Sequence, residues 1–139
     1  MRALLMTVAL AACATPAEQT RAPEVPMAET HALDGTAWRR ADDAESMPHP
    51  ATIQFDSQGG AAGFTGCNRW FAQAERHEDG ALRFGAAGTT RMACAAPAMA
   101  AEQRFLDVLS RTASARIEDN TLVFLDAGGE VIAHFERAD

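Results

Sequence analysis

Alternation of apolar and polar residues predicts a chain built mainly of β-strands from about residue 33 onward. The alternation is clearest over residues 51–56, where Ile53 and Phe55 share one face and are expected to point into the core. Glycines at short intervals around Phe64 indicate a turn and a kinked or bulged strand over residues 59–66. A turn followed by a first strand is predicted over residues 33–38. Further strands are predicted over residues 81–84, 121–125 and 130–135, the last two joined as a hairpin by the turn residues 126–129.

One segment has helical periodicity instead. Pro97 suits the first turn of a helix, which is expected to continue to about Arg111. The apolar face of this helix is formed by Phe105, Leu106 and Leu109. Glu102 falls inside that face on a helical wheel, and a buried carboxylate needs a partner. We expect Arg91 or the backbone amides of a strand turn to supply it, which makes Glu102 a structural residue and not a catalytic acid.

The N-terminal region has the pattern of a lipoprotein signal peptide. Arg2 precedes an apolar run over residues 3–12, about half the roughly 20 residues that a membrane-spanning helix needs. The sequence LAAC at residues 10–13 is similar to a lipobox. Residues 1–12 are therefore predicted to be removed and Cys13 to carry the lipid. The alternative is an ordinary signal peptide cut after residue 12 or near residue 17.

The residues after Cys13 predict a flexible tether. Residues 13–31 contain Pro16, Pro23 and Pro26 and show no apolar period. Residues 32–139 are then expected to form one folded domain. Ala14 stands where many inner-membrane lipoproteins carry aspartate, which favours attachment to the outer membrane, facing the periplasm.

Charge and composition exclude several classes of partner and cofactor. The net charge is −7 and every basic residue is arginine, which argues against nucleic acid and against a basic membrane-binding patch. Membrane contact is therefore expected through the lipid anchor alone. The four histidines, His31, His49, His77 and His134, lack the spacing of a zinc site. The sequence predicts no metal, no cofactor and no enzymatic activity.

Two cysteines remain once Cys13 is assigned to the lipid. Cys67 and Cys94 form an even pair in an oxidising compartment, which favours a disulfide. Two buried thiols, or a metal or nucleophilic site, are the alternatives. Asn68, which follows Cys67, is expected to hydrogen-bond local backbone in a turn.

Four short motifs resemble one family. They are LDGTAW at residues 33–38, GCNR at 66–69, TTRMAC at 89–94 and EQRFL at 102–106. Together they resemble the META domain of HslJ-like bacterial lipoproteins. The resemblance implies an α+β domain, with a small curved antiparallel sheet or partial barrel packed on a single helix. The motif positions, implied to be structural, are Trp38, Gly66, Cys67, Asn68, Thr90, Arg91, Met92, Cys94, Glu102 and Phe105.

The resemblance implies a role in envelope stress or antibiotic tolerance and supplies no catalytic residue. We therefore expect a non-catalytic envelope lipoprotein that acts through a protein partner. The alternative is a module that binds a small hydrophobic ligand or lipid in a cavity between the faces of the sheet. Such a cavity would be lined by Phe64, Phe71, Met92 or Phe124. An anion-binding role for Arg91 is a further alternative to its pairing with Glu102.

Overall fold

The computed structural model describes residues 32–42 and 48–138. The predicted signal peptide, Cys13 and the whole predicted tether lie outside the described residues. The elements of the described part are β1 (Ala37–Arg40), β2 (Thr52–Phe55), β3 (Gly60–Phe64), β4 (Arg69–Arg76), β5 (Leu82–Phe84), β6 (Gly88–Thr89), α1 (Ala96–Arg111), β7 (Ser114–Glu118), β8 (Thr121–Leu125) and β9 (Val131–Arg137). Among these elements α1 is not long and apolar enough to cross a membrane.

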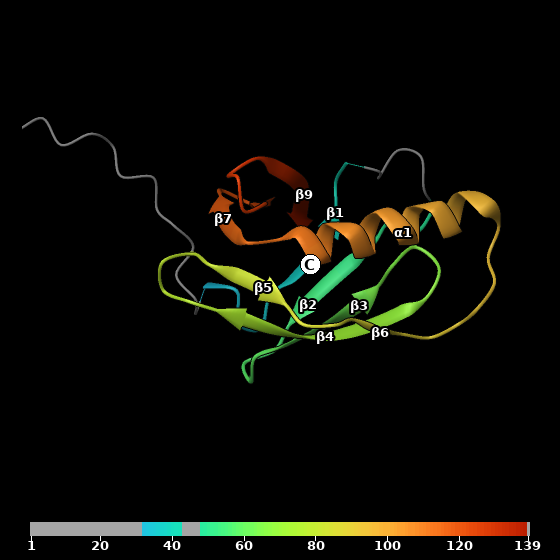
Figure 1. Cartoon of the computed structure of the whole chain (residues 1–139), viewed down its shortest axis with the longest axis horizontal. Helices are drawn as coiled ribbons and strands as arrows, with labels where there is room; N and C mark the ends of the chain where they lie inside the picture. Colours follow the sequence, from blue (N-terminus) through green and yellow to red (C-terminus); the bar gives the residue numbers. More distant parts are fainter. Residues whose placement is uncertain (1–31, 43–47, 139) are drawn as a thin grey trace, which may run out of the picture.

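The strands form one antiparallel sheet that curls towards closure (Figure 1). Their order is β5-β4-β3-β2-β1-β9-β8-β7, with β6 pairing with β4 as well. The two ends of this order meet, because Ala81 forms a bridge with Ser114 and Leu82 N donates to Ala113 O over 3.1 Å. The domain is therefore an α+β partial barrel with one helix, as expected.

Helix α1 packs against the concave face of the sheet, and aromatic rings fill the space between them. Phe105 of α1 lies 5.4 Å from the Trp70 ring of β4, measured between ring centroids. Phe124 and Phe135, from neighbouring strands, have their ring centroids 4.8 Å apart. Burying a side chain of this size contributes roughly 1.5–3 kcal/mol, so these rings provide much of the driving force for folding.

The helix agrees with its prediction, and the strands over residues 51–56, 81–84, 121–125 and 130–135 are confirmed within a residue or two. The turn and first strand predicted over residues 33–38 are both present, and the strand begins at Ala37. Residues before it form a turn, in which Thr36 Oγ1 donates to Leu33 O over 2.6 Å. Trp38 Nε1 in turn donates to Thr36 Oγ1 over 2.7 Å. The hydroxyl thereby keeps the chain in a turn and anchors the buried Trp38.

The predicted bulge in the glycine-rich strand is wrong. Strand β3 pairs with β2 and with β4 in unbroken register, while a register shift occurs at Phe124/Leu125 in β8. Gly63 serves close packing instead: a Cβ atom there would lie 2.1 Å from Thr52 O. That carbonyl also accepts a hydrogen bond from Trp70 Nε1 over 3.0 Å. The absence of a side chain at residue 63 thus leaves room for the Thr52 carbonyl and for the Trp70 indole that donates to it.

Candidate functional site

The carboxylate of Glu102 lies at the centre of a buried polar cluster. Its residue is 8% exposed on the inner face of α1, as the helical wheel predicted. Thr65 Oγ1 donates to Glu102 Oε2 over 2.5 Å, and Asn68 Nδ2 donates to the same oxygen over 3.0 Å. The predicted partners are therefore wrong. Arg91 is exposed to solvent, and the turn between β3 and β4 supplies two neutral side-chain donors in its place.

Asn68 links three segments that are distant in the sequence. Its Oδ1 accepts hydrogen bonds from Met92 N over 2.7 Å and from Thr90 Oγ1 over 2.9 Å, while its Nδ2 reaches Glu102. The expectation of local turn bonds is wrong for this side chain. Asn68 holds the segment before α1, and α1 itself, against the end of the barrel.

Thr65 makes the local bonds that were expected of Asn68. Its Oγ1 accepts from Asn68 N over 2.8 Å and from Cys67 N over 3.2 Å. Gly66, with a φ of 107°, lets the chain turn between them. Thr65 is not among the residues predicted from the sequence. The signal was present, because a threonine just before a Gly-Cys-Asn turn is placed to accept the amide hydrogens of that turn.

Cys67 and Cys94 are joined by a disulfide, the pairing that the sequence favoured. It connects the turn between β3 and β4 to the residues that precede α1. In the chain-entropy model, a cross-link over a loop of this size contributes roughly 3.5 kcal/mol. The disulfide and the bonds of Asn68 therefore hold the same two segments together.

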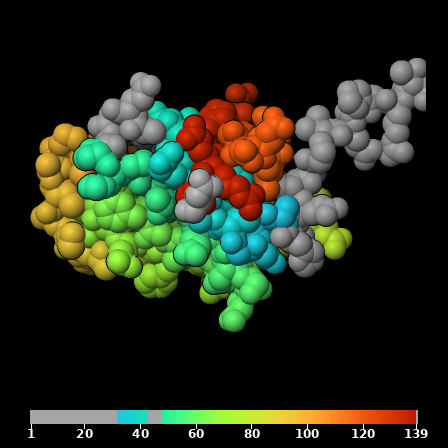
Figure 2. Space-filling view, turned by 180° about the vertical axis from the view of Figure 1, so that it is seen from behind, coloured from blue at the N-terminus to red at the C-terminus, as the bar shows by residue number. Residues whose placement is uncertain are grey.

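An open groove lies beside this cluster, on the outer face of β2, β3 and β4. Its volume is about 950 Å³. Figure 2 shows the molecule from behind, where the green surface of β2–β4 adjoins the amber residues that lead into α1. Residues along the groove include Thr52, Gln54, Ala62, Phe64, Arg69, Phe71, Thr90 and Met92. Arg69 is the one charged residue of the lining, which contains no carboxylate.

Phe71 is the most exposed large apolar residue of the described chain. Its residue is 67% exposed, and Met92 is 61% exposed. Across the strands its neighbours are Ala62 and Gly88, so no large side chain shields the ring. A Cβ atom on Gly88 would lie 2.5 Å from the ring, which shows that the ring rests directly on that glycine. The strand pairing thus places Phe71 between two small residues, Ala62 and Gly88, and leaves its ring exposed to solvent.

The comparisons with known proteins identify the family. Residues 29–139 match the model of the META domain. The chain belongs to the META-domain family. The HslJ-like resemblance of its motifs is consistent with this assignment. No curated protein matches the chain significantly.

Solved structures share the fold of this META domain. An NMR structure of a protein from Burkholderia xenovorans is 25% identical, with a TM-score of 0.65, and the match covers 90% of this chain and 97% of that chain. A second NMR structure is 21% identical, with a TM-score of 0.65, covering 81% of this chain and 97% of that one. A crystal structure of a DUF4847 family protein from Bacteroides vulgatus ATCC 8482 is 11% identical, with a TM-score of 0.55, covering 77% and 96%.

The META motif residues separate into two groups in the structure. Trp38 and Phe105 belong to the aromatic core. The polar cluster contains Thr90, Met92 and Glu102 together with the GCN motif of the turn at 66–68. Arg91 is the exception, since it points to solvent at the rim of the cluster.

The histidines that the structure describes, His49, His77 and His134, do not come together, and neither do the predicted cavity residues; His31 lies outside the described residues. His134 Nδ1 lies 3.0 Å from Asp42 Oδ1, and His49 and His77 are exposed. No group of three His, Cys, Asp or Glu residues in the described segments could hold a metal ion. Phe124 is buried in the aromatic core, whereas Phe64, Phe71 and Met92 line the outer groove. The four residues therefore do not line one internal cavity.

Proposed function

We propose that this META-domain protein is a non-catalytic, lipid-anchored protein of the bacterial envelope that acts by binding another protein. The lipobox-like sequence before Cys13 supports the anchor, and Ala14 supports the outer membrane as its location. The family resemblance supports a role in envelope stress or antibiotic tolerance. The observation that carries the proposal is the exposed Phe71 on the outer face of the sheet.

Phe71 and Met92 are both exposed and both line one groove, which favours a protein contact. Large apolar side chains that gather on the surface of a soluble domain commonly mark an interaction site. Phenylalanine and methionine are also enriched where proteins meet. A partner that covers the groove removes both side chains from water, at a gain of about 25 cal/mol for each Å² of apolar surface.

The charges around the groove define the chemistry of the partner. Arg69 and Arg91 are exposed, and neither forms an ion pair within the described residues. The chain as a whole carries a net charge of −7, whereas the groove lining contains Arg69 and no carboxylate, and Arg91 lies in the chain between the lining residues Thr90 and Met92, so this region is a local positive site. The partner segment is therefore one in which an apolar side chain stands beside an acidic one.

Site-specific photo-crosslinking in the native envelope tests the proposal. A benzophenone amino acid replaces Phe71 in the full-length chain, and the control carries it at Val131, which is 43% exposed on β9. We expect one protein adduct from residue 71 that is absent from residue 131. Sequencing of the cross-linked peptide should show an acidic residue beside an apolar one. Arg69→Ala with Arg91→Ala should weaken the adduct several-fold.

Equal adducts from both positions, or an adduct that the arginine substitutions leave unchanged, would overturn the partner assignment. The lipid anchor is tested separately with globomycin, which blocks the lipoprotein signal peptidase. Treated cells should accumulate an unprocessed precursor, and a Cys13→Ser variant should fail to label with palmitate. Normal processing under globomycin would contradict the anchor and leave the binding surface unaffected.

A further inference from the structure

Three of the four sulfur atoms of the described chain lie at one place. The cysteines and methionines of residues 32–42 and 48–138 are Cys67, Met92, Cys94 and Met99. Cys67 Sγ is bonded to Cys94 Sγ and lies 3.7 Å from Met99 Sδ. The same sulfur lies 3.4 Å from the carbonyl oxygen of Met92. Two cysteines and a thioether therefore share a single site between the β3–β4 turn and the first turn of α1.

Two features of this site stabilise thiolates once the disulfide is reduced, and they act against the buried carboxylate of Glu102, which shares the Asn68 Nδ2 donor with Cys67 Sγ. Asn68 Nδ2 lies 3.4 Å from Cys67 Sγ and is positioned to donate a hydrogen bond to a thiolate there. Cys94 directly precedes Ala95, the N-cap of α1. The first turn of α1 contains no acidic residue, and no side chain caps it. The partial positive charge of the helix N-terminus therefore remains to stabilise a thiolate at Cys94.

We propose that the reduced cluster binds one soft monovalent metal ion, Cu(I), through the thiolates of Cys67 and Cys94 and the thioether of Met99. Thiolate and thioether ligands select Cu(I) over harder ions. Zinc sites in proteins are commonly completed by four Cys, His or carboxylate ligands. The described residues offer no group of three such ligands, whereas a thioether suits Cu(I).

The distances suit three sulfur ligands around one ion. Sulfur lies about 2.3 Å from a bound metal such as zinc, so three sulfurs in a plane around an ion of this kind are about 4 Å apart. The 3.7 Å between Cys67 Sγ and Met99 Sδ is close to this spacing. Reduction breaks the bond between Cys67 and Cys94 and lets their sulfurs separate to the same extent. A small local movement is thus enough to open the site.

The reaction balances with a dithiol as the reductant. The dithiol supplies two electrons and two hydrogens to the disulfide and becomes a disulfide itself, while Cys67 and Cys94 become thiols. Binding of Cu(I) then displaces both thiol protons to solvent, and the ion keeps its charge of +1. Cu(I) binding therefore becomes tighter as the pH rises towards neutrality.

Competition for Cu(I) with the chromogenic chelator bicinchoninate tests the site. The full-length chain carries Cys13→Ser in every sample, so that Cys67 and Cys94 are its two cysteines. It is reduced with dithiothreitol, desalted without oxygen and titrated with Cu(I). We expect the reduced chain to take one Cu(I) and the oxidised chain to take none. Met99→Leu should weaken binding about tenfold or more, whereas Met92→Leu, at an exposed position, should leave it unchanged.

X-ray absorption of the Cu(I) complex gives a second readout that does not depend on the stability of a variant. Three sulfur neighbours per copper support the site, and two overturn the role of Met99. The proposal also fails if the reduced chain does not compete with bicinchoninate, or if Met99→Leu binds Cu(I) as tightly as the unsubstituted chain. The latter result would indicate binding by the two cysteines alone.

Discussion

Glu102 of α1 accepts a hydrogen bond from Thr65 in the turn between β3 and β4, with 2.5 Å between Oε2 and Oγ1. This contact joins the helix to the end of the barrel at a place where the aromatic core no longer reaches. Thr65 and Glu102 are both buried, so removing one side chain leaves the other polar group without this hydrogen bond and without water to replace it. The helix is therefore positioned by a polar contact as well as by its apolar face.

Replacement of Glu102 by alanine should destabilise the domain. The change leaves the Thr65 hydroxyl without its acceptor and removes one acceptor of Asn68 Nδ2, which keeps Met92 O, at a cost of roughly 1–3 kcal/mol, or several degrees in melting temperature. Thermal unfolding followed by circular dichroism measures the change. Glu136→Ala is the control, because this side chain is 57% exposed in a surface pair with Arg39 and should be nearly neutral. Equal melting curves for Glu102→Ala and the original chain would contradict the buried contact.

Gly63 should not tolerate alanine. A Cβ atom there would meet Thr52 O at 2.1 Å, so the paired strands must separate, at a cost of about 1–3 kcal/mol. Gly85→Ala is the matched control, because the nearest atom to its Cβ would lie 3.7 Å away. Urea unfolding of both variants gives the free energies. The packing argument fails if the two substitutions cost the same.

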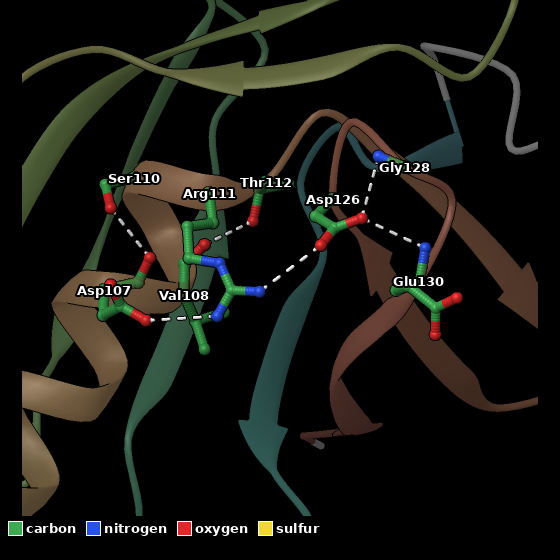
Figure 3. Close-up of polar contacts among 8 residues, drawn as sticks. All are labelled: Asp107, Val108, Ser110, Arg111, Thr112, Asp126, Gly128 and Glu130. Carbon is green, nitrogen blue, oxygen red and sulfur yellow. Dashed lines mark hydrogen bonds and ion pairs between the residues drawn. The ribbon is translucent and has the colours of Figure 1, made fainter.

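Asp126 should make the stability of the C-terminal hairpin depend on pH. Backbone hydrogen bonds from Glu130 and Gly128, with help from Arg111, hold the pKa of this carboxyl below its usual 3.8 (Figure 3). A lowered pKa in the folded state stabilises the fold above the unfolded pKa, and this contribution is lost as pH falls through the folded pKa. Asp126→Asn should therefore melt below the original chain at neutral pH, and the gap should close in acid, below about pH 3.8.

Ser110→Ala gives a control for this titration in the same region. Its hydroxyl donates to Asp107 O and does not ionise in this range, so any loss of stability should be the same at neutral and acidic pH (Figure 3). A gap between Asp126→Asn and the original chain that stays constant down to pH 2 would show that the carboxylate charge contributes nothing.

Native mass spectrometry of residues 32–139, secreted to the periplasm, should detect a bare chain two hydrogens lighter than the reduced mass. The disulfide accounts for the two hydrogens, and Phe124, one of the predicted cavity residues, is buried in the close-packed aromatic core. Mass spectra before and after denaturation separate the outcomes. A stoichiometric adduct that is lost on denaturation would revive the ligand-binding alternative, with the groove beside Phe71 as its place.

The helix and strands that were predicted correctly are those in which large apolar side chains recur at the buried positions of the helical or alternating pattern. Helix α1 and the strands over residues 51–56 and 121–125 contain Phe, Ile, Leu and Val at their buried positions. Strand β4 was missed although it alternates between buried and exposed residues throughout. Its inward positions include Ala72 and Ala74, whose small side chains give a weak hydrophobic signal. Strand β7 was missed for the same reason, since its fully buried residue is Ala115.

The burial of Glu102 was predicted from the sequence, but its partners in the polar cluster were not. Helical spacing alone showed that Glu102 is buried, because its neighbours on the wheel are local in the sequence. The partners Thr65 and Asn68 lie 37 and 34 residues away, and local patterns carry no information about which turn reaches the helix. The orientation of Arg91 towards solvent likewise depends on how Asn68 holds the backbone of Met92.

The pairing of β1 with β9 determines where segments attached to either end of the described domain emerge. Trp38 stands opposite Arg137, and Ala138 N donates to Ala37 O over 2.9 Å, so the described chain enters and leaves at one pole. The turn at Thr65–Asn68 lies at the other pole, beyond the pairing of Phe64 with Arg69. A tether attached before residue 32 and a tag attached after residue 138 would therefore both emerge at this same end of the barrel. The opposite pole, with the sulfur cluster and the adjoining end of the groove, would stay clear of both.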